Sequence, residues 1–420
     1  MTTRLSRLHP YPAMVGDELA FSLARQYVPP QASVLDPFCG SGKLLMAAED
    51  AAIRVGIDTN PLAWLLTKAK LAPTQETTFA LLVAGIEQAR RTVSSAPSRP
   101  FLDRKVEWFT PPVLFELQRI VCWINSLEIQ ESDRLLMAAA LSATVREVSF
   151  ARLNGWKLHR LGETARSAFE ACPWERFERR LRYCLSELRT RRRAQGEYHV
   201  ALADARSLSD PYNLVRAHGP FDVVLTSPPY GDSRTTVQYG AASALCLAIV
   251  SQLKGLAHLA RPGGQIDREC LGGHSRDVPM PRNSKRYWAG AATNKAERSV
   301  AAYLADYDEI CGAIANNIKP EGKAIFVLGR RSTGGYRLKL DLFTVDRFAA
   351  RGFDLLSREF HTLHRKRVPK KINKFGRSYS NEDRSRGIVK TIDNEVVLVM
   401  QKRINSTKSC NTAGLYEHHA

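Results

Sequence analysis

One short segment, Thr226 to Tyr230 with the sequence Thr-Ser-Pro-Pro-Tyr, combines residue types that can bind and orient an amine. It follows Phe221 to Leu225, an apolar run typical of a buried strand. Consecutive prolines fix φ and withhold two amide donors, which leaves carbonyl oxygens as acceptors. A hydroxyl and a carbonyl can bind both N–H groups of an exocyclic amine and aim its lone pair at a methyl donor, while the tyrosine stacks on an extruded base. The alternatives are a rigid turn or a ligand for a WW-type module.

A second segment, Asp36 to Gly42, is a glycine-rich turn between an apolar run and a helical pattern. Small residues at the carboxyl end of a strand let the backbone approach a ligand. The turn is not specific by itself, because neither G-x-G-x-x-G nor a Walker lysine motif is present. Asp58 ends the next strand, where a carboxylate can accept hydrogen bonds from both ribose hydroxyls. Its alternative role is a cap for a helix from Asn60 to Lys70.

The elements that position these residues are predicted to form one sheet. A strand, the glycine turn, a helix and a strand follow one another from residue 32 to 58, which predicts a parallel βαβ unit. An antiparallel edge hairpin is predicted from 354–363 with 395–401. Further strands are predicted over 199–204, 221–226 and 322–329, and helices over 16–28, 43–50, 165–193, 241–260 and 297–317. Residues 261–290 are rich in Gly, Pro and basic residues, which predicts an irregular loop.

Charge and cysteine usage narrow the class of protein. The 61 Lys and Arg exceed the 42 Asp and Glu by 19, an excess that suits a polyanionic partner. No apolar run approaches the ~18 residues of a membrane span, and the basic start lacks a secretory signal's apolar stretch, so we expect a cytoplasmic protein without a membrane partner. Eight cysteines without C-x-x-C or zinc-type spacing indicate reduced thiols and no metal site.

Together the two motifs resemble the S-adenosylmethionine-dependent amino-methylating DNA methyltransferases, and the Ser-Pro-Pro-Tyr form is most similar to their N4-cytosine branch in restriction-modification systems. Adenine-N6 enzymes more often have Asp or Asn in place of Ser227. The resemblance covers roughly 8–72 and 198–402. It implies an α/β, Rossmann-like methyltransferase fold with a mixed, mostly parallel sheet, an antiparallel edge hairpin and a helical insertion.

The resemblance also assigns site residues. Those implied to hold S-adenosylmethionine are Tyr11, Pro12, Asp36, Pro37, Phe38, Cys39, Gly40, Gly42, Asp58, Asn60, Asp204 and Ala205. Those implied to act on the target base are Ser227, Pro228, Pro229 and Tyr230. Within this assignment, Asp58 binds the ribose and Asp204 the adenine amino group of the cofactor.

The sequence argues against methylation of cytosine C5, which needs a thiolate nucleophile in a Pro-Cys context. No cysteine here follows a proline. Direct attack by the amine on the sulfonium methyl, without a covalent intermediate, is therefore the expected reaction.

Two basic loops are the candidates for contact with DNA phosphates. The first has Arg282, Lys285 and Arg286, and the second has Arg365, Lys366, Arg367, Lys370 and Lys371. Either loop alone is equally well a solvated charged loop. With the net charge of +19, phosphate contact becomes the better prediction for at least one of them.

The predicted organisation has four parts. They are a cofactor-binding half over 1–73, a helical insertion over 74–196, a catalytic half over 197–403 with basic loops at 261–295 and 364–390, and a disordered tail over 404–420. The insertion is a candidate for DNA contact or target recognition. Its stretch from Ser149 to Arg160 mixes aromatic and basic residues, which suits nucleic acid or a helix connection with a core tryptophan.

The leading hypothesis is a site-specific DNA N4-cytosine methyltransferase that acts on a flipped-out base in duplex DNA, in the cytoplasm at the nucleoid. A companion restriction endonuclease acting on the same site is then an expected partner. The alternatives are an adenine-N6 DNA enzyme, an RNA amino-methyltransferase, and a catalytically silent DNA-binding subunit. Intact Gly40, Gly42, Asp58, Ser227 and Tyr230 count against the silent subunit.

Overall fold

The computed structural model describes most of the 420-residue chain. The described residues are 8–12, 14–94, 106–152, 158–190, 196–209, 214–231, 238–273, 277–288, 294–329, 332–333, 336–362, 371–373, 388–390 and 394–404. All but the first residue of the predicted tail over 404–420 lies outside them. No described helix is long and apolar enough to span a bilayer.

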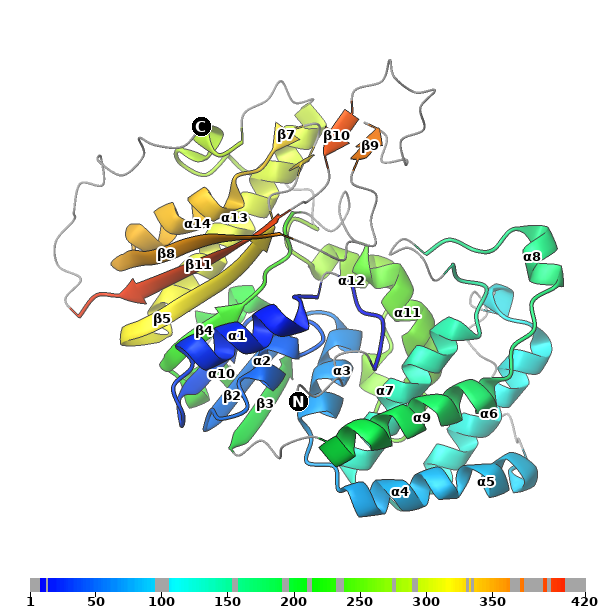
Figure 1. Ribbon diagram of the computed structural model, residues 1–420. Coiled ribbons are helices and arrows are strands. Elements are labelled where there is room, and N and C mark those ends of the chain that lie inside the picture. Colours follow the sequence, from blue (N-terminus) through cyan, green and yellow to red (C-terminus); the bar gives the residue numbers. More distant parts are fainter. Residues whose placement is uncertain are drawn as a thin grey trace.

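A seven-stranded sheet in the order β3-β2-β1-β4-β5-β11-β8 organises the fold (Figure 1). Its strands are β1 (Ser33–Asp36), β2 (Ile53–Asp58), β3 (Glu197–Leu202), β4 (Phe221–Thr226), β5 (Ile318–Gly329), β8 (Phe353–Thr362) and β11 (Asn394–Lys402). The first five strands in this order are parallel, and β11 runs antiparallel between β5 and β8. The predicted mixed α/β sheet with an antiparallel hairpin at its edge is thereby confirmed.

Two small antiparallel pairs lie outside this sheet. They are β6 (Ser332–Thr333) with β7 (Tyr336–Arg337), and β9 (Lys371–Asn373) with β10 (Ile388–Lys390).

The central strands are buried on both faces, which explains their continuous apolar runs. Successive side chains of a strand point to opposite faces. Val34 and Val223 accordingly belong to the core on one face, whereas Leu35 and Val224 belong to the core on the other. The first face is covered by α1 (Asp17–Tyr27), α2 (Lys43–Ala47) and α3 (Pro61–Leu71), and the second by α10 (Leu214–His218), α13 (Asn294–Asn316) and α14 (Leu340–Ala349).

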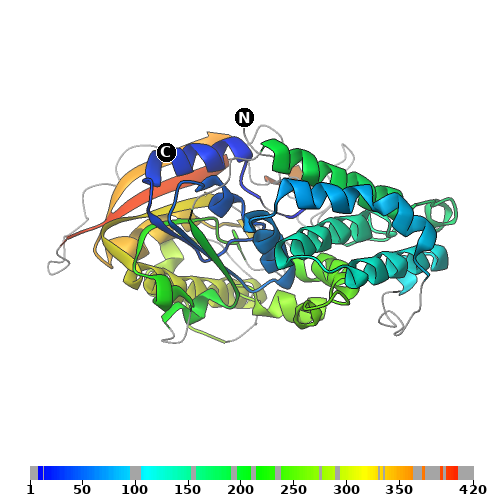
Figure 2. The same cartoon turned by 90° about the horizontal axis from the view of Figure 1, so that it is seen from below.

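A group of helices lies beside the sheet, next to α3 (Figure 2). Its members are α4 (Glu76–Ala84), α5 (Ile86–Thr92), α6 (Pro111–Ser126), α7 (Glu131–Glu147), α8 (Glu163–Ser167), α9 (Pro173–Thr190), α11 (Tyr239–Val250) and α12 (Gly263–Glu269). The central helix, α7, is buried almost throughout and packs against α3, α9 and α11. The core of these helices is continuous with the core on the first face of the sheet.

Several local predictions differ from the structure. The amphipathic helix expected over 165–193 is two helices, α8 and α9, and Pro173 begins the second because its fixed φ suits a first helical turn. The loop expected over 261–290 contains α12, which buries Ile266, and a 3₁₀ helix, Ser284–Arg286. Helix α14 was not expected. Other 3₁₀ helices are Val106–Trp108, Ala205–Ser209 and Ala257–Leu259.

Candidate active site

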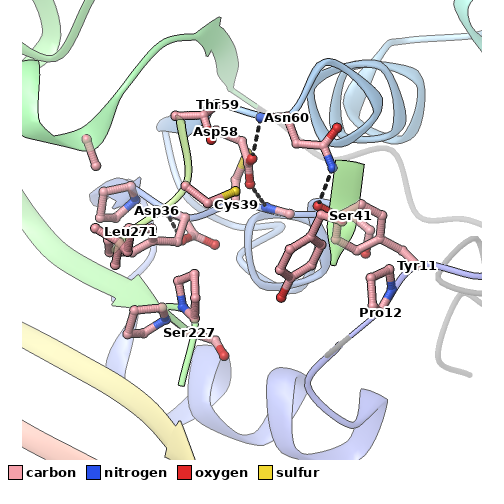
Figure 3. A pocket seen from close by; sticks show the side chains of 18 of the residues that line it. Tyr11, Pro12, Asp36, Cys39, Ser41, Asp58, Thr59, Asn60, Ser227 and Leu271 are labelled. Carbon is pink, nitrogen blue, oxygen red and sulfur yellow. Dashed lines mark hydrogen bonds between the residues drawn. The ribbon is translucent and has the colours of Figure 1, made fainter. Parts of the chain in front are cut away.

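A cavity lies where four neighbouring strands of the sheet end (Figure 3). Strands β1, β2 and β4 end at Asp36, Asp58 and Thr226, and β3 ends just before Asp204. The strand order reverses between β1 and β4, and ligands of open α/β sheets bind at such a switch point. The cavity holds about 930 Å³ of space, its open mouth included. Every predicted cofactor-binding or catalytic residue lines it except Gly42.

The first carboxylate, Asp36, joins the two motifs that the sequence singles out. Its Oδ1 accepts hydrogen bonds from the Phe38 amide, at 3.1 Å, and from the Thr226 hydroxyl, at 2.6 Å. Burial raises the pKa of Asp36 to about 7, although both hydrogen bonds oppose that rise. The glycine turn and the Ser-Pro-Pro-Tyr segment are therefore held together by one buried side chain.

The second carboxylate, Asp58, holds the glycine turn from the neighbouring strand. Its two oxygens accept from the Gly40 amide at 2.9 Å and the Asn60 amide at 2.8 Å, and burial raises its pKa to about 6. The alternative role as a helix cap belongs to Asn60, whose side chain accepts from the Leu62 amide at 3.0 Å. Each Asp58 oxygen keeps a second lone pair for a ligand.

Asn60 lines the cavity, but its side chain is used within the protein. Its amide nitrogen donates to the Tyr11 hydroxyl at 3.2 Å and to the Ser243 hydroxyl at 3.0 Å. The Tyr11 ring also lies 5.9 Å from the Tyr239 ring and covers Gly40. Asn60 therefore positions the tyrosine that closes one side of the cavity (Figure 3).

Gly42 has a packing role. It begins α2 with φ of +75°, in the left-handed region that favours glycine. A Cβ atom there would lie 2.8 Å from the Thr67 Oγ1 and 3.0 Å from the Thr67 Cα, so the glycine lets α2 approach α3. The structure thus gives a reason for this glycine that does not involve the cavity.

Replacing Gly42 with Ala is expected to lower the free energy of unfolding by about 2–4 kcal/mol, from left-handed backbone strain and the contact with Thr67. Thermal or urea unfolding measures this. Gly264→Ala is the matched control, because Gly264 lies in α12 with nothing within 4 Å of its Cβ position. Equal stability of the two variants would contradict the packing role.

Asp204 lines the cavity, and its carboxylate forms an ion pair with Arg206. Both oxygens of its carboxylate accept hydrogen bonds from the Arg206 guanidinium, and Oδ1 also accepts from the Arg206 amide at 2.8 Å. Arg206 also contacts Asp306 on α13 at 3.2 Å and reaches the Glu269 carbonyl at the end of α12. The expected contact of Asp204 with an adenine amino group therefore has to be made by the lone pairs that Arg206 leaves.

The Ser-Pro-Pro-Tyr segment forms the opposite wall of the cavity. The Pro229 carbonyl accepts a hydrogen bond of 2.6 Å from the Tyr303 hydroxyl, whereas no described residue donates to the Pro228 carbonyl. Ser227 Oγ lies 3.2 Å from the Tyr230 hydroxyl, which donates to Glu395 Oε1 at 3.3 Å. Of the two proline carbonyls expected as acceptors, that of Pro229 is therefore already used by Tyr303.

Cys39 is the cysteine of the glycine turn, and it is buried. Its Sγ accepts a long contact of 3.7 Å from the Thr67 hydroxyl, and burial raises the pKa of the thiol well above its ordinary value. A thiol that stays protonated is a poor nucleophile. This environment agrees with a reaction that uses no covalent cysteine intermediate.

The first predicted DNA-facing loop is folded onto α14. Tyr287 and Trp288 lie in the core rather than on the surface. Arg286 is exposed but pairs with Asp346 at 2.6 Å, and Arg282 is exposed. Of the second predicted loop, Lys371 begins β9. The remaining predicted DNA contacts lie outside the described residues: the Lys285 side chain, Arg365, Lys366, Arg367 and Lys370.

Several residues of the site belong to none of the motifs that the sequence analysis identified. The cavity wall is completed by residues of α11 and α13, by the last residue of α12 and by the two residues after it: Tyr239, Ile310, Glu269, Cys270 and Leu271. Glu395 and Gly329, which contact Tyr230, come from β11 and β5. The only sequence signal for these two was their place in the predicted strands 322–329 and 395–401.

Known proteins that are similar to this chain include methyltransferases. No protein-family model matches the sequence. The structure of the rRNA methyltransferase aviRa from Streptomyces viridochromogenes aligns with 13% sequence identity and covers 94% of this chain and 88% of its own. The structure of TTHA0409 from Thermus thermophilus aligns with 20% sequence identity and covers 26% of this chain and 40% of its own. Their TM-scores of 0.32 and 0.18 are too low to support an argument.

The sequence similarity is more extensive. The Type II methyltransferase M.MvaI from Kocuria varians is 26% identical over 424 aligned positions, which cover 96% of this chain and 92% of that protein. This chain is therefore similar over nearly its whole length to a Type II methyltransferase.

Proposed function

We propose that this chain is an S-adenosylmethionine-dependent DNA methyltransferase that methylates the exocyclic N4 amine of cytosine. The observation that carries the proposal is the Thr226–Asp36 hydrogen bond of 2.6 Å, which holds an amine-binding segment against a glycine turn at adjacent strand ends. The full-length similarity to a Type II methyltransferase supports the same reaction class.

The cavity fits S-adenosylmethionine by the chemistry of its donors and acceptors. Gly40 has φ of +50° beneath the Tyr11 ring, so the turn presents backbone rather than side chain at this point. Asp58 keeps lone pairs for ribose hydroxyls, and the buried Asp36 is suited to a cationic neighbour because burial disfavours its negative charge alone. When bound, S-adenosylmethionine supplies an electrophilic methyl group on a sulfonium.

The residues that follow β4 orient the nucleophile. Ser227 Oγ and the Pro228 carbonyl can each accept one N–H of an exocyclic amine, which aims the nitrogen lone pair across the cavity toward the glycine turn. With S-adenosylmethionine held beside Asp36 and Asp58, the amine nitrogen would take the methyl group from the sulfonium sulfur, which would keep the bonding electrons, and the nitrogen would lose one proton. The Tyr230 ring provides a face for the extruded base.

Cytosine in duplex DNA is proposed as the target because Ser227 occupies the position where adenine-N6 enzymes more often have Asp or Asn. The net charge of +19 favours a polyanionic substrate. Arg282 and the basic loop at 364–390 remain proposed phosphate contacts. A Type II relative also supports a role in protecting DNA from a companion restriction endonuclease.

The test is to incubate the protein with S-adenosylmethionine labelled on its methyl group and with unmethylated plasmid DNA or total RNA, then digest each product to nucleosides. The expected result is label in N4-methylcytosine from DNA. Label confined to N6-methyladenine would refute the cytosine assignment, and label confined to RNA would refute the DNA substrate. A Ser227→Ala variant is the control for labelling by a contaminating enzyme.

A further inference from the structure

Tyr230 contacts two residues that lie opposite each other on neighbouring strands. Glu395 on β11 pairs in register with Gly329 on β5. A Cβ atom at Gly329 would lie 2.4 Å from Cδ2 and 2.7 Å from Cε2 of Tyr230, so the ring rests directly on this glycine. The hydroxyl of the same ring reaches Glu395 Oε1 at 3.3 Å. One neighbour makes room for the ring and the other holds its polar end.

Glu395 belongs to a chain of three hydrogen-bonding groups that leads into the cavity. Ser227 Oγ lies 3.2 Å from the Tyr230 hydroxyl, which lies 3.3 Å from Glu395. A carboxylate only accepts hydrogen bonds, whereas a hydroxyl both donates and accepts. If Tyr230 donates to Glu395, its oxygen is left to accept from the Ser227 hydroxyl. The Ser227 lone pairs then point away from this chain of groups.

We infer that Glu395 is a positioning residue, which sets the direction of these hydrogen bonds so that Ser227 presents lone pairs to the target amine. This inference rests on the proposed function and adds the residue that keeps its amine-binding hydroxyl in the accepting orientation. The same three hydrogen-bonding groups also provide a route for the proton that the amine nitrogen loses. As the amine nitrogen gives a proton to Ser227 Oγ, the Ser227 proton passes to Tyr230 and the Tyr230 proton to Glu395.

The surroundings of these groups agree with this direction. Burial and the nearby charge of Glu395 keep the pKa of Tyr230 well above its ordinary value, so the phenol stays protonated and can donate. Glu395 is 6% exposed, and burial raises its pKa. The hydrogen bond from Tyr230 and the positive charge of Lys43 counter that rise.

The experiment measures methyl transfer to plasmid DNA by wild type, Glu395→Gln, Tyr230→Phe and the double variant. A glutamine can donate to the Tyr230 oxygen and reverse the chain of hydrogen bonds, so kcat should fall about tenfold, the loss of one charge-assisted hydrogen bond. The KM for S-adenosylmethionine should stay within about twofold. In the Tyr230→Phe background, Glu395→Gln should change kcat by less than about twofold, because the connection is already broken.

Glu359→Gln is the matched control, an exposed glutamate on the neighbouring strand β8 that should keep wild-type kcat. Calorimetric binding of S-adenosylmethionine shows that each variant is folded. Unchanged kcat in Glu395→Gln, or an equal loss with and without the Tyr230 hydroxyl, would overturn the inference while the proposed function stands. No transfer to DNA by the wild type would overturn the proposed function. Transfer to adenine N6 with the expected coupling would support the inference, which concerns amines of either base.

Discussion

Replacement of Tyr230 with Ala is expected to lower kcat by at least about 10²-fold while the dissociation constant of S-adenosylmethionine changes by about twofold or less. The substitution removes the ring that faces an extruded base, a contact worth about 1–3 kcal/mol per base. It also removes the partner of the Ser227 hydroxyl, 3.2 Å away. Steady-state methylation kinetics with plasmid DNA and calorimetry with the cofactor measure the two effects separately.

Asp58→Ala is expected to weaken cofactor binding rather than engagement of the target base. It tests whether the site divides into a cofactor-binding part and a base-binding part as proposed. It leaves the Gly40 and Asn60 amides without their acceptor and removes the proposed ribose partner. Cofactor affinity should then fall about tenfold or more, because hydrogen bonds to charged groups contribute about 1.5–3 kcal/mol each. Tyr230→Phe, which keeps the ring, separates stacking from hydrogen bonding. If Tyr230→Ala and Asp58→Ala both weakened only cofactor binding, the proposed division of the site would be wrong.

The strand framework could be predicted because its signals are local. The predicted range 221–226 matches β4, and 33–36 lies within the predicted first strand, since both strands are apolar on both faces. The prediction for β3 was displaced by two residues because this edge strand is only partly buried and shows little alternation. The motifs at the ends of β1, β2 and β4 fall on one cavity because parallel strands end at one edge of the sheet.

The contacts that complete the site could not be predicted, since they join residues that are distant in the sequence. Glu395 and Tyr230 are separated by 165 positions and meet only because β11 inserts between β5 and β8. The pairing of Asp204 with Arg206 is close in sequence, but nothing local distinguishes it from two solvated charges. Tyr287 and Trp288 follow the basic residues of the first loop predicted to contact DNA, but both are buried in the core, and Tyr287 packs edge-on against Phe343 of α14, a helix that the sequence did not reveal.

The pH dependence of cofactor binding is expected to follow Asp36 and Asp58. Burial raises their pKa values to about 7 and about 6, so in the free protein both are partly protonated near neutral pH. A raised carboxyl pKa means that the folded chain binds protons more tightly than the unfolded chain. The stability that each group contributes is therefore fully present below about pH 4 and is lost as the pH rises through about 6–7.

A cationic ligand beside these carboxylates favours their charged forms and lowers their pKa values, so binding of S-adenosylmethionine should release protons. Affinity should accordingly rise between pH 5.5 and pH 7.5, by about 6- to 12-fold if binding lowers the pKa of Asp36 from about 7 by 1–1.5 units. Calorimetry at the two pH values, in buffers of different ionisation enthalpy, measures both the affinity and the protons released.

Two controls identify the groups responsible. S-adenosylhomocysteine carries the same adenosine and amino acid without the sulfonium charge, so its affinity should depend less on pH. Asp36→Asn removes the group with the higher pKa and should leave only the weaker dependence due to Asp58, centred near pH 6. An affinity that is equal at pH 5.5 and 7.5, or an unchanged pH dependence in Asp36→Asn, would mean that the cation does not bind beside Asp36. The cofactor would then have to lie elsewhere in the cavity than the Thr226–Asp36 contact implies.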